Sequence, residues 1–165
     1  DYILVKQGGK INAVGTPDKP IVMTSEKEEP GAWGGIHICG RAHTNAEGGK
    51  GSSEIGGAVY GGNDDADNSG TLQYIRLEYT GFAFDEEHEA NGISFYGVGN
   101  GTIVDHCQAY KGSDDGFEFF GGSVNVSNLV AVSCSDDSFD WTEGWNRRGA
   151  NLVAYPEAAP PQGTG

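Results

Sequence analysis

Short stretches of alternating apolar and polar residues recur along the chain, separated by glycine. Residues 34–40, 92–97, 116–122 and 138–144 share one frame, in which Gly or Ser precedes an apolar, a polar and an apolar residue. Glycine stands at or near the end of each copy. Alternation with a period of two is typical of a β-strand that buries one face. The pattern therefore predicts four short strands that face a common core.

A second frame lies between these strands. Residues 70–81 align without a gap onto residues 101–112, and residues 122–134 form a looser copy that is one residue longer. Each period thus holds a short strand, a glycine turn and a longer strand or strand pair. The N-terminal segments "YILV", "KINAV" and "PIVMTS" are expected to form the first period in the same way.

The spacing of the copies predicts how they stack. The segment "SDDGFEFFGG" at residue 113 returns as "SDDSFDWTEG" 22 residues later. A period of this length without a helical stretch predicts an all-β fold, a parallel β-helix of about five rungs that stack at about 4.8 Å. Leucine-rich repeats have a similar period but need Leu at fixed steps, and Leu is rare here. An antiparallel sandwich is the other candidate, although it does not explain why side chains recur from rung to rung.

Stacking in register predicts specific contacts. Phe117 is expected to lie on Phe139, and Phe119 on Trp141, inside the solenoid. Each stacked aromatic pair contributes about 0.5–1.5 kcal/mol beyond its buried area. The repeat is therefore expected to stabilise the fold in the first place.

The domain organisation follows from where the repeat is interrupted. Residues 1–155 are predicted to form a single β-helix domain, and residues 156–165 a Pro/Gly-rich C-terminal tail. Residues 41–69, rich in Gly, Ser, Asn and Asp, are too long for a turn and are predicted to leave the solenoid as an inserted loop. The first residues lack the features of a signal peptide, so we expect a processed form or a segment of a longer chain.

Several longer motifs are also similar to a known family: "GTPDKPIVMTS", "GAWGGIHICG", "YGGNDDADNSGTLQYIRLEYTG", "NGISFYGVGNGT" and "DDGFEFFGG". From about Ile3 to Trp145 the chain resembles a family of secreted or surface bacterial proteins, known mostly as hypothetical or lipoprotein-like proteins. The resemblance implies a right-handed parallel β-helix and an extracellular setting, either secreted or at the cell surface. It implies no activity and no catalytic residues.

Composition narrows the range of partners. The chain has 165 residues, 24 of them acidic and 10 basic, with a net charge of −14. This balance argues against a nucleic-acid surface, which needs clustered Lys and Arg. No apolar run approaches the roughly 18 residues of a membrane span. The three cysteines, Cys39, Cys107 and Cys134, match no metal-ligand spacing and are expected to be small buried hydrophobes.

Stacking also aligns acidic side chains: Asp114 over Asp136, Asp115 over Asp137, and Glu118 over Asp140. Two carboxylates about 4.8 Å apart repel by roughly 1 kcal/mol in water, and by about 3 kcal/mol at an effective dielectric constant of 20. A shared proton, hydrogen bonds from backbone N–H groups or a bridging cation can relieve this repulsion. Calcium accepts six to eight oxygens in irregular geometry. We therefore predict that these six residues are calcium ligands, the alternative being solvated acidic turns without an ion.

A second candidate calcium loop is "NDDADNSG", which carries Asp64, Asp65 and Asp67. Its spacing differs from that of an EF-hand, because the Gly and the closing Glu are misplaced. The acidic cluster at residues 84–90 is expected to be a solvated loop. The four histidines match no zinc signature, and neither a metal-binding nor a catalytic role is predicted for any of them.

These features favour a non-catalytic extracellular module with a structural or assembly role, stabilised by calcium. The open strand edges at the ends of a solenoid favour self-association or contact with other surface proteins. The alternative is a polysaccharide-binding or polysaccharide-cleaving protein. In that case Asp114/Asp136 and Glu118/Asp140, about 5 Å apart, would supply acid and base. Ice binding is disfavoured, because the file of Thr71 and Thr102 stops at Ser123.

Overall fold

The computed structural model describes residues 1–85 and 88–157, so most of the predicted tail, residues 158–165, lies outside the described residues. The described part is nearly all β-structure, and neighbouring strands in its two large sheets run parallel. No helix in these two ranges has the length and hydrophobicity needed to cross a bilayer.

One parallel sheet has the order β1-β4-β8-β10-β12. These strands are the short alternating segments of the sequence: β1 (Ile3–Val5), β4 (Ile36–Cys39), β8 (Ile93–Tyr96), β10 (Phe117–Phe120) and β12 (Phe139–Thr142). We call it the short-strand sheet. Neighbouring strands come from successive turns of the chain, so the four predicted strands lie side by side in one sheet.

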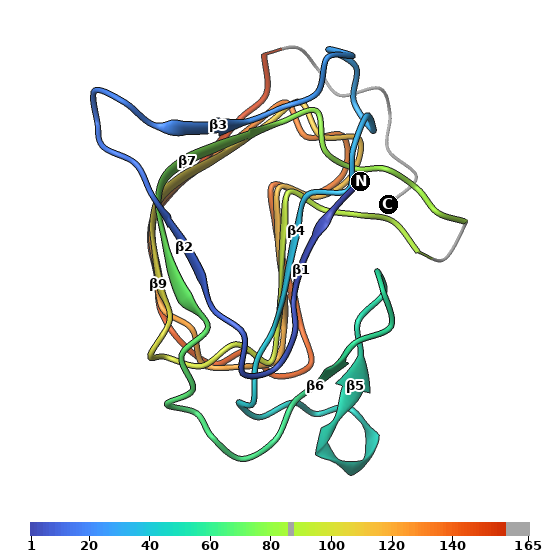
Figure 1. The fold of residues 1–165 in the computed structure, drawn as a ribbon, viewed down its shortest axis with the longest axis vertical. Coiled ribbons are helices and arrows are strands. Elements are labelled where there is room, and N and C mark those ends of the chain that lie inside the picture. Colours follow the sequence, from blue (N-terminus) through green and yellow to red (C-terminus); the bar gives the residue numbers. More distant parts are fainter. Residues whose placement is uncertain (86–87, 158–165) are drawn as a thin grey trace.

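The other parallel sheet has the order β13-β11-β9-β7-β2, with β3 also paired to β7. We call it the long-strand sheet. Its strands are β2 (Ile11–Val14), β3 (Ile21–Met23), β7 (Gly70–Glu78), β9 (Ile103–Tyr110), β11 (Val126–Val132) and β13 (Gly149–Tyr155). Figure 1 shows the successive turns of the chain superposed, with the two sheets on opposite sides of the core.

The register agrees with the repeat. Phe117 pairs with Ile93 on one side and with Phe139 on the other. The rings of Phe117 and Phe139 stack with centroids 5.5 Å apart. The apolar residues of both sheets form one core between them, which contains Leu72, Leu129 and Phe95 among others. The predicted file of like side chains is confirmed at this position.

The prediction for Trp141 was wrong in one respect. Trp141 pairs with Phe119 along the backbone, but its side chain is 61 % exposed. Trp145 instead stacks on Phe119, with centroids 4.5 Å apart, and its Nε1–H donates to the carbonyl of Val124 at 3.0 Å. Among the described residues β12 is the edge strand of its sheet and no further strand buries Trp141, and Trp145 takes the space over Phe119.

Residues 41–69 lie between β4 and β7 and contain η1 (Glu47–Gly49) and the antiparallel pair β5 (Gly51–Ser52) and β6 (Val59–Tyr60). Ala58 and Tyr60 pack with Cys39, Tyr96 and Phe120 in a second apolar cluster. In Figure 1 β5 and β6 lie outside β1 and β4. This segment therefore covers part of the outer face of the short-strand sheet and brings Glu54 to that face.

Candidate metal centre

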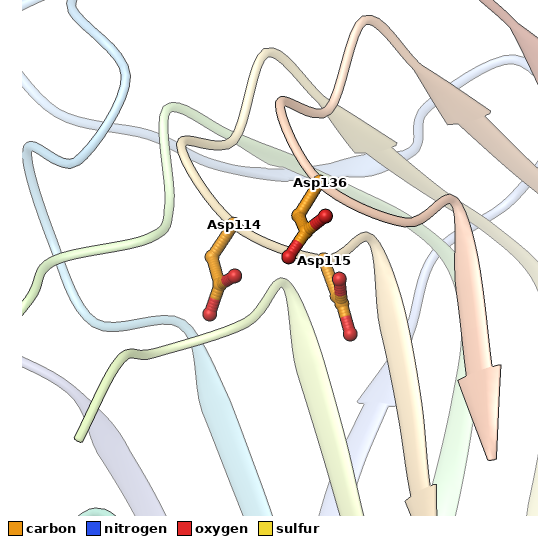
Figure 2. Close-up of side chains that lie close together, drawn as sticks. All are labelled: Asp114, Asp115 and Asp136. Atoms are coloured by element: carbon orange, nitrogen blue, oxygen red, sulfur yellow. The ribbon is translucent and has the colours of Figure 1, made fainter. Parts of the chain in front are cut away.

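Two successive turns bring three aspartates together. Asp114 and Asp115 lie in the turn before β10, and Asp136 lies in the turn before β12. One carboxylate oxygen from each falls in a group whose members are all within 4.8 Å of one another. Figure 2 shows the three carboxylates side by side. We call Asp114, Asp115 and Asp136 the outer triad, because Asp136 is exposed.

A second group lies next to the first and shares Asp115. Glu118 and Asp140 are paired neighbours in β10 and β12, on the outer face of the short-strand sheet. Their carboxylates and that of Asp115 also lie within 4.8 Å of one another. We call Asp115, Glu118 and Asp140 the inner triad, since Asp115 is buried and the other two are half-buried.

Both triads belong to one acidic hollow. Among the described residues, those that line it are all acidic: Glu54, Glu89, Asp114, Asp115, Glu118, Asp136, Asp137 and Asp140. The six residues predicted from the repeat are therefore brought together. Glu54 from the 41–69 segment and Glu89 from the loop before β8 join them, and no periodic signal in the sequence indicated either residue.

Glycine allows these turns to stack so closely. The amide of Gly92 donates to the carbonyl of Asp115, and the amide of Gly116 donates to the carbonyl of Asp137, each at 2.9 Å. A Cβ at Gly92 would collide with the carbonyl oxygen of Gly116. The same stacking lets Asp115 Oδ1 accept a hydrogen bond from the amide of Asp137 at 2.8 Å. One of the three ways to relieve carboxylate repulsion is thus present at Asp115.

Burial and mutual repulsion raise the proton affinity of the hollow. Desolvation, reinforced by the charges of Glu89 and Asp136, raises the pKa of Asp114 to about 7. Desolvation raises the pKa of Asp115 to about 8, although its hydrogen bond from the Asp137 amide acts in the opposite direction. Desolvation and the charge of Glu54 raise the pKa of Glu118 to about 9. These carboxylates therefore need a proton or another cation near neutral pH.

Asn91 adds an uncharged oxygen beside the inner triad. Its side chain is 1 % exposed, and its Nδ2 donates to Glu118 Oε2 at 2.5 Å and to Ser94 Oγ at 3.0 Å. Its Oδ1 is buried and has no hydrogen-bond partner among the described residues. A buried amide oxygen without a partner is costly, and it is also a ligand that calcium accepts. The register of β8 and β10 aligns Asn91 with Asp115.

The donor set of the hollow consists of carboxylate oxygens with one amide oxygen beside them. Such a set suits a hard cation and offers no nitrogen or sulfur ligand for zinc. The residues present therefore fit calcium.

A comparison with protein families matches residues 1–164 to the pectate-lyase-like β-helix domain. The chain belongs to this family. No curated protein and no solved structure matches it. The family match agrees with the parallel sheets of the structure and confirms the predicted β-helix fold.

In this β-helix domain the second predicted calcium loop makes contacts with backbone N–H groups. Asp67 Oδ2 accepts from the amide of Arg41 at 2.8 Å, and Asp64 Oδ1 accepts from the amide of Ala66 at 3.1 Å. Asp65 Oδ1 contacts the amide and Nδ1 of His43, which lowers the pKa of Asp65. The three residues Asp64, Asp65 and Asp67 belong to neither triad, and these contacts stabilise the loop conformation.

Proposed function

We propose that this pectate-lyase-like β-helix domain is a non-catalytic structural module, secreted or displayed at the cell surface, that binds calcium in the acidic hollow. The observation that carries the proposal is the convergence of eight carboxylates on one hollow, six of them from files set by the repeat. The proposal includes a single right-handed domain over residues 1–155, with about five rungs and residues 41–69 inserted.

Calcium is the cation that fits best. It binds six to eight oxygens in flexible geometry, whereas magnesium demands a near-octahedral shell and retains several waters. The raised pKa values of Asp114, Asp115 and Glu118 also support a cation, since they show how unfavourable the bare anions are. Extracellular modules bind calcium at about 10⁻⁴–10⁻³ M, so a site of this kind would be filled outside the cell.

The test is thermal unfolding with and without calcium. At a free concentration one hundred times its Kd, an ion that binds only the folded state adds about 2.7 kcal/mol. For a chain of this size that corresponds to a rise in Tm of about 5–10 °C. We expect this rise with calcium and a smaller one with magnesium.

The matched variants for this test are Glu118→Gln and Asp18→Asn. Glu118 lies in the hollow, whereas Asp18 is exposed in the loop between β2 and β3. Glu118→Gln should reduce the calcium-dependent rise in Tm, and Asp18→Asn should leave it intact. A melting curve that calcium does not shift would remove calcium from the proposed function.

The assembly role is supported by the two ends of the solenoid. Within the described residues, β12 and β13 are edge strands at one end, where Trp141, Val153 and Tyr155 are exposed. β2 and β3 lie at the other end, where Val14 and Val22 are exposed. Unpaired strand edges are templates for a further strand. We propose that the end of one copy stacks on the beginning of another.

Polysaccharide binding or cleavage is the second candidate, and the family match favours it. Glu118 and Asp140 lie within one group of 4.8 Å, and Glu118, with its pKa raised to about 9, would be a protonated acid at neutral pH. A lyase also needs a base, and the described lining of the hollow supplies only carboxylates. Incubation with neutral and acidic polysaccharides tests cleavage, because a structural module releases no product, and co-sedimentation with the same insoluble polysaccharides tests binding.

A further inference from the structure

We infer that copies of this domain join head to tail into an open filament, in which both parallel sheets continue from one copy into the next in register. The inference rests on the proposed assembly role, because it specifies the joint, the surface where the end of one copy meets the beginning of another. In the described part of the chain, β12 and β13 form the edge at the end of the solenoid, and β1, β2 and β3 form the edge at its beginning.

In the short-strand sheet one file of apolar residues runs from edge to edge. Ile3 pairs with Ile36, Ile36 with Ile93, Ile93 with Phe117 and Phe117 with Phe139. The three inner members of this file are 0 % exposed, whereas Ile3 is 37 % exposed and Phe139 is half-buried. One further step in the same register brings Ile3 of a second copy beside Phe139. The joint would thus complete the burial of both terminal members.

In the long-strand sheet a second file ends in the same way. Ile21 pairs with Ile75, and the file continues through Cys107 and Leu129 to Leu152. The three inner members are buried, Ile21 is half-buried, and Leu152 is exposed although its neighbour Leu129 lies in the core. One further step brings Ile21 of the second copy beside Leu152. Because both files need one further step, a single displacement along the solenoid axis can extend the two sheets together.

The joint would also cover apolar side chains that no described strand of their own copy buries. Trp141 is 61 % exposed, and the register places it beside Val5 of the second copy. Val153 and Val22 are 49 % and 50 % exposed and would pair with each other. Strand edges associate through unpaired backbone groups and exposed apolar surface. A second copy supplies both in the matching register, which makes it the partner that these edges fit.

The two surfaces of the joint differ, so the contact between copies is heterologous. A heterologous contact forms a ring only where the rotation between copies closes, and otherwise it forms an open chain. In this joint the copies are displaced along the solenoid axis, and each added copy again presents β12 and β13 at its free end. We therefore expect a filament with a direction, in which strands repeat at about 4.8 Å along its length.

The experiment blocks the two surfaces of the joint one at a time. Val22→Lys places a charge at the beginning of the solenoid and Val153→Lys at its end, and both replace exposed side chains. Sedimentation measures the mass of each variant alone and of an equimolar mixture, after circular dichroism has shown that each variant is folded. We expect each variant alone to remain a monomer. The mixture should form a dimer of twice the monomer mass and grow no further, because each variant retains the surface that the other lacks.

Wild-type protein and Val59→Lys are the controls, and electron microscopy should show filaments for both. If one blocked variant dimerises alone while the other does not, like ends join, which would overturn the head-to-tail joint and leave the assembly role standing. A blocked variant that forms filaments alone, a mixture that stays monomeric or a wild type that stops at a dimer would also overturn this joint. A wild type that is monomeric at millimolar concentration would overturn both the filament and the proposed assembly role.

Discussion

Trp145 shows how a single side chain covers a buried ring near the end of the solenoid. Its ring stacks on Phe119 at 4.5 Å and its indole N–H donates to the carbonyl of Val124. Trp141 follows the strand register and remains 61 % exposed. The two tryptophans lie 6.4 Å apart between ring centroids, yet only one of them shields the buried ring of Phe119.

Because Trp145 and not Trp141 covers Phe119, replacing each tryptophan by alanine should change the free energy of unfolding by different amounts. Removing a buried tryptophan costs about 3–5 kcal/mol, and Trp145 is only half-buried, so Trp145→Ala should lower the free energy of unfolding by about 2 kcal/mol. Trp141→Ala should change it by less than about 0.5 kcal/mol. Urea unfolding measures both values. A loss for Trp141→Ala equal to that for Trp145→Ala would contradict the assignment.

At the scale of elements, the turns before β10 and β12 concentrate charge because stacking repeats each side chain one turn further on. The register pairs Glu118 with Asp140, and the neighbouring turn pairs Asp115 with Asp137. In an isolated turn these acids would be well solvated. Stacked in a hollow that Glu54 and Glu89 also line, three of them, Asp114, Asp115 and Glu118, have raised pKa values.

This arrangement predicts an unusual dependence of stability on pH. In the unfolded chain the carboxyl pKa values are about 4, whereas the folded pKa values of Asp114, Asp115 and Glu118 are about 7, 8 and 9. Between about pH 4 and these values the folded state binds more protons, so its stability falls as pH rises. In chelator we expect a lower free energy of unfolding at pH 8.5 than at pH 5.

Calcium should offset the loss of stability at pH 8.5, because it would replace the protons on the carboxylate oxygens of Asp114, Asp115 and Glu118. Denaturant unfolding at both pH values, in chelator and in calcium, measures the effect. Glu118→Gln provides a comparison, since its amide does not titrate and the slope with pH should become smaller. A free energy of unfolding that rises from pH 5 to pH 8.5 in chelator would contradict the raised pKa values of these carboxyl groups.

At the scale of the whole molecule, the 41–69 segment ties the solenoid together. Glu143, just after β12, accepts a hydrogen bond from the hydroxyl of Tyr60 at 3.0 Å and another from Thr44. The segment thus spans from β4 to the last turn and holds Glu54 over the hollow. The two ends of the sheets remain as uncovered strand edges in the described part of the chain.

The proposed end-to-end association has a defined register. If β3 of a second copy pairs with β13 in the register of the long-strand sheet, Val22 of that copy lies beside Val153. Val130 of β11 already lies beside Val153 on the other side. We expect the sedimentation-derived mass to increase with protein concentration, and Val153→Lys to suppress the increase. Val59→Lys is the matched control, because Val59 is similarly exposed but lies in β6, which belongs to neither of the two large sheets. A monodisperse monomer at millimolar concentration would contradict the association.

Much of the fold and six of the eight residues that line the acidic hollow could be predicted because they are periodic. The 22-residue spacing places Phe117 on Phe139 and Glu118 beside Asp140, and the structure has both pairs. The prediction that Asp64, Asp65 and Asp67 bind calcium depended on the composition of their loop alone. In the structure their carboxylates accept hydrogen bonds from amides that lie up to 26 residues away, contacts which no repeat encodes.

The sequence by itself determined which side chains lie in files, because in a parallel solenoid the contact between neighbouring turns is a function of the repeat length. Only the tertiary structure decided that Glu54 and Glu89 lie at the same hollow, that Asn91 holds Glu118, and that Trp145 covers Phe119. Glu54, Glu89 and Trp145 lie in segments without a period, so the packing of these segments sets their positions, and the repeat aligns Asn91 with Asp115 without indicating which side chain it contacts.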